Sequence, residues 1–419
     1  MYWPLPRYRL YSSKLMYLKS LLKLPFNFVR SDKKIVSLEC ELKAFFSVKE
    51  AIFVNQARVG LFLLASALFD LKRKKVLCSA YTIHDAVNML VAAGWDPVFC
   101  DIDPVTFNMK MDDLKAKILS RDDVGAVVIT HLHGVLCDFS EIEKICKEKN
   151  IAILEDAAQA VGAFDHRGYA GATGYAGVLS FGLMKNISSF YGGAILTNDL
   201  NLAKKLRKTQ SRWKKISKIM FLKRMAQGLI LSLATSPIIF QFITFRIFAT
   251  GLKNDVGSIN RLSQSETNPK LMRTFPESYK IRPSNLQASL VLEQLKTLES
   301  NMKLRRATAN HYYENLNDLS DFNCLSPEEH SGSCFMQYPI KVAQRKDFLV
   351  FLNESGFDCA GQHLRNCAGL PCFSDWQTHC PNSALAETTT VLLPTYPRYE
   401  KMEAGRLVQK ARSYLENKV

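Results

Sequence analysis

The chain has 419 residues and a net charge of +16, and 47% of its residues are hydrophobic. This length favours two domains, and the composition fits a soluble or peripherally membrane-bound globular enzyme. A basic chain first suggests nucleic-acid binding, but no helix-turn-helix, zinc-finger or RNP pattern supports it, so no nucleic-acid partner is expected.

The N-terminal segment, residues 1–34, is basic and amphipathic. Residues 1–31 carry six basic side chains and no acid, and Tyr11, Leu15 and Leu22 fall at helical spacing. The basic residues interrupt the apolar ones so often that no signal-peptide core forms, which predicts a cytoplasmic protein. The segment is interpreted either as a helix that contacts a membrane surface or as one that packs on the large domain.

The eleven cysteines include no CxxC pair and no Cys/His cluster at metal spacing. This pattern argues against a disulfide framework and against a metal site, so no metal is expected. The thiols are interpreted as reduced and mostly buried.

Residues 35–213 alternate between short apolar runs and helix-length segments. Segments such as DAVNMLVAAG and FSEIEKICKEKN separate runs of strand length. The runs are KKVLCSA, DPVFCDI, GAVVITHL, IAILEDA, GVLSFG and GGAILTN. This alternation predicts an α/β fold with a mostly parallel central sheet and helices on both faces.

The stretch from Glu155 to Lys185 carries the residue types that carbonyl chemistry on amines requires. The apolar run NIAILE places Asp156 at a strand end, where its carboxylate avoids solvent. A second run, AGVLSF, contains Ser180, and Lys185 follows five residues later. Such chemistry needs a lysine amine, an acid and donors for a phosphate group.

The motifs EDAAQAVGA, SFGLMKN and GGAILTND, in this order and spacing, resemble the DegT/StrS family of pyridoxal phosphate (PLP) dependent sugar aminotransferases. The resemblance covers residues 35 to 415 apart from one insertion. It implies a homodimer of fold-type I PLP transferases. The large PLP-binding domain would span 35–213, with a return and linking helix at 259–300 and a smaller C-terminal α+β domain at 301–419.

The resemblance also assigns roles to residues around the lysine. Lys185 matches the lysine that forms the Schiff base with PLP, and Asp156 matches the acid that pairs with the pyridinium nitrogen. Gln159 matches a residue near the ring face, and Ser180 matches a hydroxyl that donates to the cofactor phosphate. Asn186 is interpreted either as a residue that orients the lysine or as a turn residue.

The expected phosphate-binding turn departs from the commonest family pattern. Where many relatives have Ser-Gly-Thr at a helix start, this chain has Gln56, Ala57 and Arg58. Backbone amides at a helix N-terminus bind phosphate whatever the side chains, and we expect Arg58 to add a bidentate contact. Lys280 stands where relatives have an asparagine that reaches the phosphate across the dimer interface.

Further departures concern the ring face and the substrate pocket. Ile83 stands where the family has an aromatic residue that stacks on the ring, which predicts aliphatic stacking. Phe190 and Tyr191 replace small and acidic residues of the family, which predicts a bulkier, less charged pocket floor. His131 and His133 alternate on a predicted strand and are interpreted as core histidines rather than as a metal site.

An insertion at residues 214–258 interrupts the family pattern. Residues 200–254 carry twelve basic side chains and no acid, and the 21 residues from Met225 to Phe245 carry no charge. That length suffices for one membrane span. A single crossing, however, would put the two parts of the large domain on opposite sides of the membrane.

Ser236 and Pro237 break the apolar run near its middle. The sequence therefore predicts a helical hairpin, with arms at about 216–235 and 238–252, that dips into the cytoplasmic leaflet while its basic flanks meet anionic headgroups. The alternative is a hairpin that is buried against the enzyme or a dimer partner. In the first interpretation, membrane contact runs through residues 216–252.

The resemblance implies transfer of an amino group, from L-glutamate, to a nucleotide- or lipid-linked keto-sugar. The product would serve surface polysaccharide or glycan synthesis at the inner face of the cell membrane. One alternative is a PLP sugar dehydratase, although the family's dehydratases replace the lysine that Lys185 matches. Another is a non-catalytic, membrane-associated subunit of a glycan assembly complex.

Overall fold

The computed structural model describes residues 4–10, 32–253, 268–319, 322–361, 363–399 and 401–416. The amphipathic helix predicted around Tyr11 to Leu22 lies outside these described residues. The same holds for the last part of the insertion, residues 254–258.

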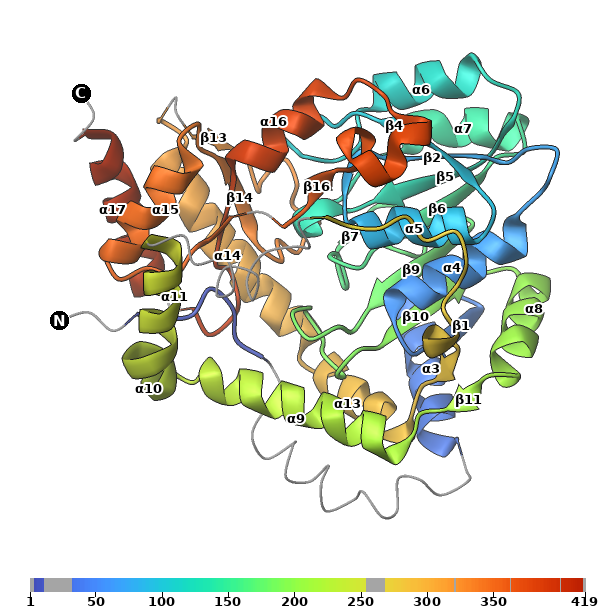
Figure 1. Cartoon of the computed structure of the whole chain (residues 1–419), viewed down its shortest axis with the longest axis horizontal. Coiled ribbons are helices and arrows are strands. Elements are labelled where there is room, and N and C mark those ends of the chain that lie inside the picture. Colours follow the sequence, from blue (N-terminus) through green and yellow to red (C-terminus); the bar gives the residue numbers. More distant parts are fainter. Residues whose placement is uncertain are drawn as a thin grey trace.

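A seven-stranded sheet forms the centre of the larger lobe (Figure 1). Its strands lie in the order β1-β10-β9-β6-β5-β2-β4. The five strands from β9 to β4 run parallel, whereas β10 is antiparallel to both of its neighbours. The strands are β1 (Glu50–Val54), β2 (Lys75–Ser79), β4 (Asp96–Cys100), β5 (Val124–Thr130), β6 (Ala152–Asp156), β9 (Ala176–Ser180) and β10 (Gly193–Thr197). The prediction of a mostly parallel sheet is confirmed.

Helices cover both faces of this sheet because successive strand residues point to opposite sides. In β5, Ala126 and Val128 pack toward one helical layer, while Val127 and Ile129 pack toward the other. The first layer contains α4 (Ala57–Leu68), α5 (His84–Ala92) and α8 (Leu200–Ser211). The second contains α3 (Lys33–Phe46), α6 (Met111–Leu119), α7 (Ser140–Glu148) and α13 (Asn285–Leu295).

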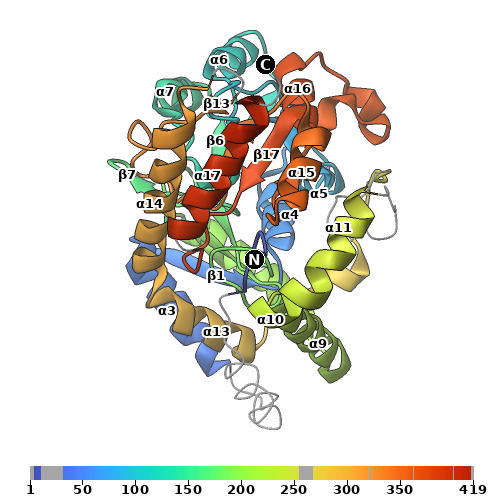
Figure 2. The same cartoon turned by 90° about the vertical axis from the view of Figure 1, so that its left-hand side faces the viewer.

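The smaller lobe is built around a four-stranded antiparallel sheet in the order β13-β14-β17-β15 (Figure 2). Its strands are β13 (Asn323–Cys324), β14 (Tyr338–Lys341), β15 (Ala360–Gly361) and β17 (Thr390–Leu393). The long helix α14 (Leu298–Leu316) connects the two lobes, and α15 (Arg345–Glu354), α16 (Pro381–Thr389) and α17 (Lys401–Glu416) follow.

Short elements complete the described chain. Three of them are two-stranded ladders: β3 (Tyr81–Thr82) with β16 (Arg365–Asn366), β7 (Phe164–Asp165) with β8 (Gly168–Tyr169), and β11 (Lys214–Lys215) with β12 (Ile281–Arg282). The others are short 3-10 helices: η1 (Leu132–Gly134), η3 (Glu277–Tyr279), η4 (Cys367–Gly369) and η5 (Pro371–Trp376).

The insertion forms two helical arms, α9 (Lys218–Ala234) and a second arm of α10 (Pro237–Ile239), η2 (Phe240–Thr244) and α11 (Phe245–Lys253). The arms break at Ser236, as predicted, because Pro237 starts the second arm. They are bent by 68° rather than folded back on each other, so the predicted hairpin is wrong. In Figure 1, α9 lies along the lower edge of the larger lobe and α11 rises beside α15.

The physical reason for the open bend is that each arm packs on a different lobe. Phe221 and Met225 of α9 are 2% and 3% exposed and join a core cluster with Phe190 and Ile281. The second arm contacts the smaller lobe through α15. Among the described helices, none alone has the length and apolar composition to cross a membrane, and the two arms meet that test only when they are taken together.

Candidate active site

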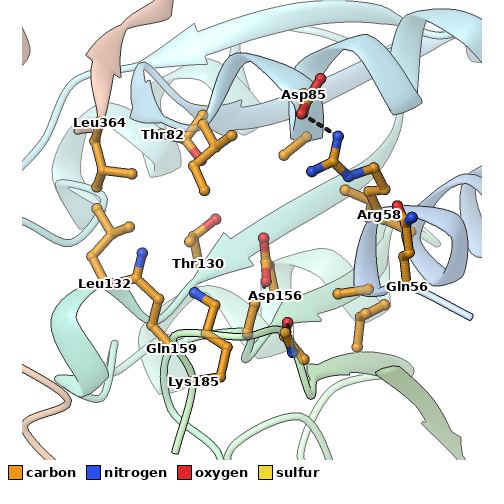
Figure 3. A pocket seen from close by; sticks show the side chains of 18 of the residues that line it. Gln56, Arg58, Thr82, Asp85, Thr130, Leu132, Asp156, Gln159, Lys185 and Leu364 are labelled. Atoms are coloured by element: carbon orange, nitrogen blue, oxygen red, sulfur yellow. Dashed lines mark hydrogen bonds and ion pairs between the residues drawn. The ribbon is translucent and has the colours of Figure 1, made fainter. Parts of the chain in front are cut away.

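Polar side chains gather where three neighbouring parallel strands end. Thr130, Asp156 and Ser180 are the last residues of β5, β6 and β9. The carboxyl ends of parallel strands form one edge of a sheet, which is where α/β proteins bind ligands. A cavity of about 210 Å³ opens at this edge (Figure 3). Seven of the predicted site residues line it: Ala57, Arg58, Ile83, Asp156, Gln159, Ser180 and Lys185.

Lys185 lies in the loop after β9 and points into the cavity beside Asp156 (Figure 3). Burial lowers the pKa of the Lys185 amine to about 8, while the negative charge of Asp156 acts in the opposite direction. Burial likewise raises the pKa of the Asp156 carboxyl, against a bond from the Ala158 amide at 3.0 Å. The pair combines an amine that deprotonates near neutral pH with a partly buried acid.

An anion-binding cup lies next to this pair. Helix α4 begins at Ala57, after Gln56 in extended conformation, so its first amides face the cavity. Gly193 makes this approach possible, because a Cβ there would lie 2.8 Å from the Ala57 nitrogen. Ser180 pairs with Gly193 across the β9–β10 ladder, so its hydroxyl lies on the same face of the sheet as the start of α4.

The guanidinium of Arg58 already has partners in the chain. It forms an ion pair with Asp85, and its Nη1 lies 3.3 Å from the Tyr279 hydroxyl. Asp85 is the first acid of α5, which also contributes the cavity-lining Ala86. Arg58 therefore lines the cavity, but a phosphate would have to share it with Asp85, and its predicted contact with the phosphate stays a prediction.

Two other predicted residues lie against the cavity with defined neighbours. Gln159 is 6% exposed, and its Oε1 accepts a bond of 2.8 Å from the His133 amide, which fixes the side chain. Ile83 precedes α5 and packs with the buried Leu132 and Leu364 on the apolar side of the cavity. The predicted aliphatic contact with a ring remains a proposal.

Asn186 and Lys280 do not line the cavity of their own chain. The Asn186 side chain is buried, and its Nδ2 donates a hydrogen bond to the Val161 carbonyl at 3.2 Å. This bond supports a role of Asn186 in the conformation of the loop that carries Lys185, and not contact with the cofactor. Lys280 forms an ion pair with Glu277 and is partly exposed. Its predicted reach across a dimer interface stays a prediction.

The sequence did not single out Tyr8, which contacts the lysine loop directly. Its hydroxyl donates to the Lys185 carbonyl at 2.8 Å and lies 3.2 Å from the Leu183 carbonyl. The preceding Arg7 binds Asp358 of the smaller lobe with its backbone nitrogen at 2.9 Å and its Nε at 2.7 Å. Residues 4–10 therefore tie the lysine loop to the smaller lobe.

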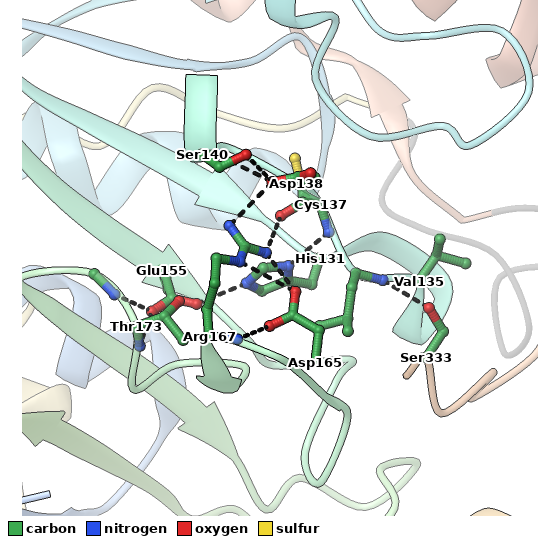
Figure 4. A network of polar contacts seen from close by, with 12 residues as sticks. His131, Val135, Cys137, Asp138, Ser140, Glu155, Asp165, Arg167, Thr173 and Ser333 are labelled. Atoms are coloured by element: carbon green, nitrogen blue, oxygen red, sulfur yellow. Dashed lines mark hydrogen bonds and ion pairs between the residues drawn. The ribbon is translucent and has the colours of Figure 1, made fainter. Parts of the chain in front are cut away.

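A buried network supports the end of β6 (Figure 4). The Glu155 carboxylate accepts bonds from His131 Nε2 at 2.9 Å and from the amides of Gly171, Thr173 and Gly174. These bonds keep the pKa of Glu155 below its ordinary value although burial acts to raise it. His131 is thus a core histidine, as predicted, and its Nδ1 accepts from the Cys137 amide.

The predicted strand over both histidines is wrong beyond Thr130, where β5 ends. His133 lies in η1 with φ of 58°, and burial lowers its pKa to about 3. In the part of the chain that the structure describes, no group of three or more His, Cys, Asp or Glu side chains has the arrangement of a metal site.

Comparison with known families decides which chemistry this site serves. The sequence model of the DegT/DnrJ/EryC1/StrS aminotransferase family matches residues 19–225 and 253–412. The chain belongs to this family. It is accordingly a PLP-dependent aminotransferase of the kind that acts on sugars. The match omits residues 226–252, most of the two inserted arms.

The sequence identity to individual relatives is low or covers only part of the chain. The "Pleiotropic regulatory protein" of Geobacillus stearothermophilus is 24% identical over 382 residues, which cover 90% of this chain and 88% of that protein. The GDP-perosamine synthase of Caulobacter vibrioides is 34% identical over 173 residues, or 41% of this chain and 46% of that protein. The alignment with the synthase thus spans less than half of either protein.

Solved structures confirm the fold. Helicobacter pylori PseC, an aminotransferase of pseudoaminic acid biosynthesis, has a TM-score of 0.76 at 19% identity and covers 99% of this chain and 100% of its own. A GDP-4-keto-6-deoxymannose-3-dehydratase has a TM-score of 0.74 at 18% identity and covers 98% of this chain and 100% of its own. At these identities the likeness establishes the fold alone.

The residues at the cavity fit PLP. The cofactor carries a phosphate, a ring nitrogen that is most useful when protonated, and a carbonyl that condenses with an amine. The start of α4 and Ser180 line one side of the cavity, and their amides and hydroxyl suit the phosphate. Asp156 supplies a partly buried carboxylate for the ring nitrogen, and Lys185 supplies the amine.

Proposed function

We propose that this protein transfers the amino group of L-glutamate to a keto-sugar that is linked to a nucleotide or a lipid, and that Lys185 is the residue to which the cofactor is attached. The observation that carries the proposal is that Lys185, whose pKa is about 8, lies beside the partly buried Asp156 in the cavity. A surface lysine would stay protonated at neutral pH.

Each of the side chains around the cofactor would have its own role in the transfer. PLP, when bound, supplies an electron sink for the transfer. Asp156 would hold the ring nitrogen protonated, and Ser180 with the α4 amides would bind the phosphate. Released from the cofactor, the Lys185 Nζ would move a proton to and from the carbon that carries the amino group, which its pKa of about 8 permits near neutral pH.

A sugar acceptor linked to a nucleotide is supported by the relatives. GDP-perosamine synthase is one of them, and PseC shares the fold. A lipid-linked acceptor is the second form that the proposal includes, because the inserted arms expose apolar side chains beside the enzyme. The amino donor is proposed as L-glutamate from the resemblance alone.

Dehydration of the same sugars is the competing activity. The fold does not distinguish an aminotransferase from a dehydratase, because a sugar dehydratase shares it. Lys185 supports transfer, because the resemblance implies that dehydratases lack this lysine. A non-catalytic subunit would not need a lysine of lowered pKa beside a carboxylate, so the Lys185–Asp156 pair supports an enzyme.

The test is to incubate the purified protein with PLP, L-glutamate and GDP-4-keto-6-deoxymannose, and to follow the sugar by mass spectrometry. We expect an aminated sugar nucleotide and 2-oxoglutarate in equal amounts, and no product from Lys185→Ala. Loss of the sugar's hydroxyl group without amination would favour the dehydratase. A protein that binds no PLP would support the non-catalytic alternative.

A homodimer and membrane contact complete the proposal. Lys280 would reach the partner's phosphate cup, as the resemblance implies. The inserted arms would contact the anionic inner face of the cell membrane, because exposed apolar and basic residues share them. The apolar ones include Ile219, Ile230, Ile238, Phe242, Ile243 and Ile247, which are 47% to 80% exposed. The exposed basic ones include Lys218, Lys223 and Arg246.

A further inference from the structure

Tyr191 of the cavity wall and the preceding Phe190 have a backbone conformation that non-glycine residues rarely adopt. Phe190 has φ of 59° and the next residue, Tyr191, has φ of 87°. Such a conformation is strained in a non-glycine residue and persists only where its surroundings hold it. Tyr191 lines the cavity, while Phe190 is 2% exposed and points into the core.

Side chains of α9 pack against both Phe190 and Tyr191. Phe221 and Met225 of α9 pack in the same cluster as Phe190. Arg224, between them in sequence, places its guanidinium carbon 5.2 Å from the centroid of the Tyr191 ring. A cation at this distance over an aromatic face is attracted by the ring's electron density, and more strongly when both are shielded from water.

Arg224 is itself fixed by burial and by a neutral partner. It is 9% exposed, and its Nη1 donates to Asn55 Oδ1 at 2.6 Å. Asn55 directly precedes the phosphate cup, so Arg224 stands between the inserted helix, the cup and Tyr191. On the other side, Gln287 of α13 donates to the Tyr191 carbonyl.

We propose that Arg224 of α9 is a positioning residue that holds Tyr191 as a specificity-determining wall of the sugar pocket. An aromatic face offers dispersion contacts to the C–H face of a sugar ring, but it offers no counter-charge to the carboxylates of an amino acid donor. The pair therefore acts on the keto-sugar acceptor and not on L-glutamate. This inference rests on the proposed function.

The experiment measures the two half-reactions separately, with L-glutamate as donor and GDP-4-keto-6-deoxymannose as acceptor. In Arg224→Ala we expect the KM for the sugar to rise about tenfold, with PLP absorbance and the glutamate half-reaction unchanged. Tyr191→Ala should act in the same direction, and the double variant should add little to either single change. Tyr191→Phe keeps the ring and should stay close to wild type.

Lys223→Ala is the matched control, because it removes a basic residue of the same helix turn that is exposed to solvent. An unchanged sugar KM in Arg224→Ala, an equal loss in both half-reactions, or the same loss in Lys223→Ala would overturn the proposal.

A second measurement does not depend on turnover and separates this inference from the proposed function. If the wild type aminates no sugar, the proposed function fails, and hydrogen exchange of the cofactor-free protein still tests the positioning. Exchange over residues 188–193 should become faster in Arg224→Ala and not in Lys223→Ala. Unchanged exchange in Arg224→Ala would contradict the role of Arg224 in holding Tyr191.

Discussion

At Lys185, burial and a neighbouring carboxylate act in opposite directions on the same amine. Burial lowers the pKa to about 8, and the charge of Asp156 limits the decrease. Below that pH the ammonium form predominates and cannot attack a carbonyl, whereas above it the free amine can. The structure thus sets the pH range in which the lysine works.

Attachment of PLP to the cofactor-free protein should therefore accelerate with rising pH and level off above a midpoint near 8. Asp156→Asn removes the charge that raises the lysine pKa, so the midpoint should move to lower pH. Stopped-flow absorbance at a series of pH values measures both. A midpoint that stays in place or moves upward in Asp156→Asn would contradict the assigned interaction.

Tyr8 acts on the same loop from the other end of the chain. Tyr8→Phe removes the hydroxyl that bonds to the Lys185 carbonyl, and a neutral hydrogen bond is worth about 1 kcal/mol. We expect kcat to fall about fivefold. Tyr312→Phe is the control, because its hydroxyl bonds the Pro394 carbonyl at 2.9 Å, away from the lysine. Equal kcat values in the two variants would show that Tyr8 serves stability alone.

At the scale of elements, the end of β6 depends on the buried carboxylate next to Asp156. Glu155 accepts three amide bonds and one from His131, so Glu155→Gln should lower the free energy of unfolding by about 2–3 kcal/mol. Urea denaturation at pH 7 measures the loss. The exposed Glu148→Gln serves as control and should stay within about 0.5 kcal/mol of wild type.

The pH dependence of this contribution has a definite sign. The folded-state pKa of Glu155 lies below its ordinary value of 4.5, so the folded protein favours the carboxylate. The stabilisation is complete above pH 4.5 and is lost as the pH falls toward the folded-state pKa. The difference in unfolding free energy between wild type and Glu155→Gln should thus shrink below pH 4.5.

The same scale shows what the sequence can and cannot predict. All six predicted runs form strands of the central sheet, because apolar runs between helix-length segments are a local signal. The break at Ser236 is local too, since Pro237 causes it. No local signal predicts the angle between the two arms. It depends on tertiary contacts, because Phe221 and Met225 pack on the larger lobe while α11 contacts the smaller one.

The candidate site also contains residues that the sequence predicts and residues that it does not. The motifs located Asp156, Ser180 and Lys185 because the family resemblance carries them at fixed spacing. Tyr8 was missed because its contact spans 177 residues and no motif records it. The ion pair of Arg58 with Asp85 was missed for the same reason, since the pairing depends on how α4 and α5 pack.

At the scale of the whole molecule, the inserted arms should bind the protein to membranes. It should float with vesicles that contain anionic lipid, and high salt alone should release little of it, because apolar burial persists when headgroup attraction is screened. Serine at Ile230, Ile238, Phe242, Ile243 and Ile247 should abolish flotation and leave PLP binding intact.

The structure dictates this choice of substitutions. A linker in place of residues 216–252 would remove Phe221 and Met225 from the core, whereas the five substituted side chains are exposed. Serine at Leu71, Leu119 and Leu385, which are exposed outside the insertion, is the matched control and should leave flotation unchanged. Flotation of the five-site variant, or none of the wild type, would remove the membrane proposal and with it the support for a lipid-linked acceptor.

The most direct test of the whole account is to reduce the PLP-loaded protein with borohydride and to locate the covalently attached cofactor by peptide mass spectrometry. The account predicts that the cofactor is found on the peptide that contains Lys185, and that Lys185→Ala, while still folded, carries none. Attachment to another lysine, or attachment that survives in Lys185→Ala, would contradict it.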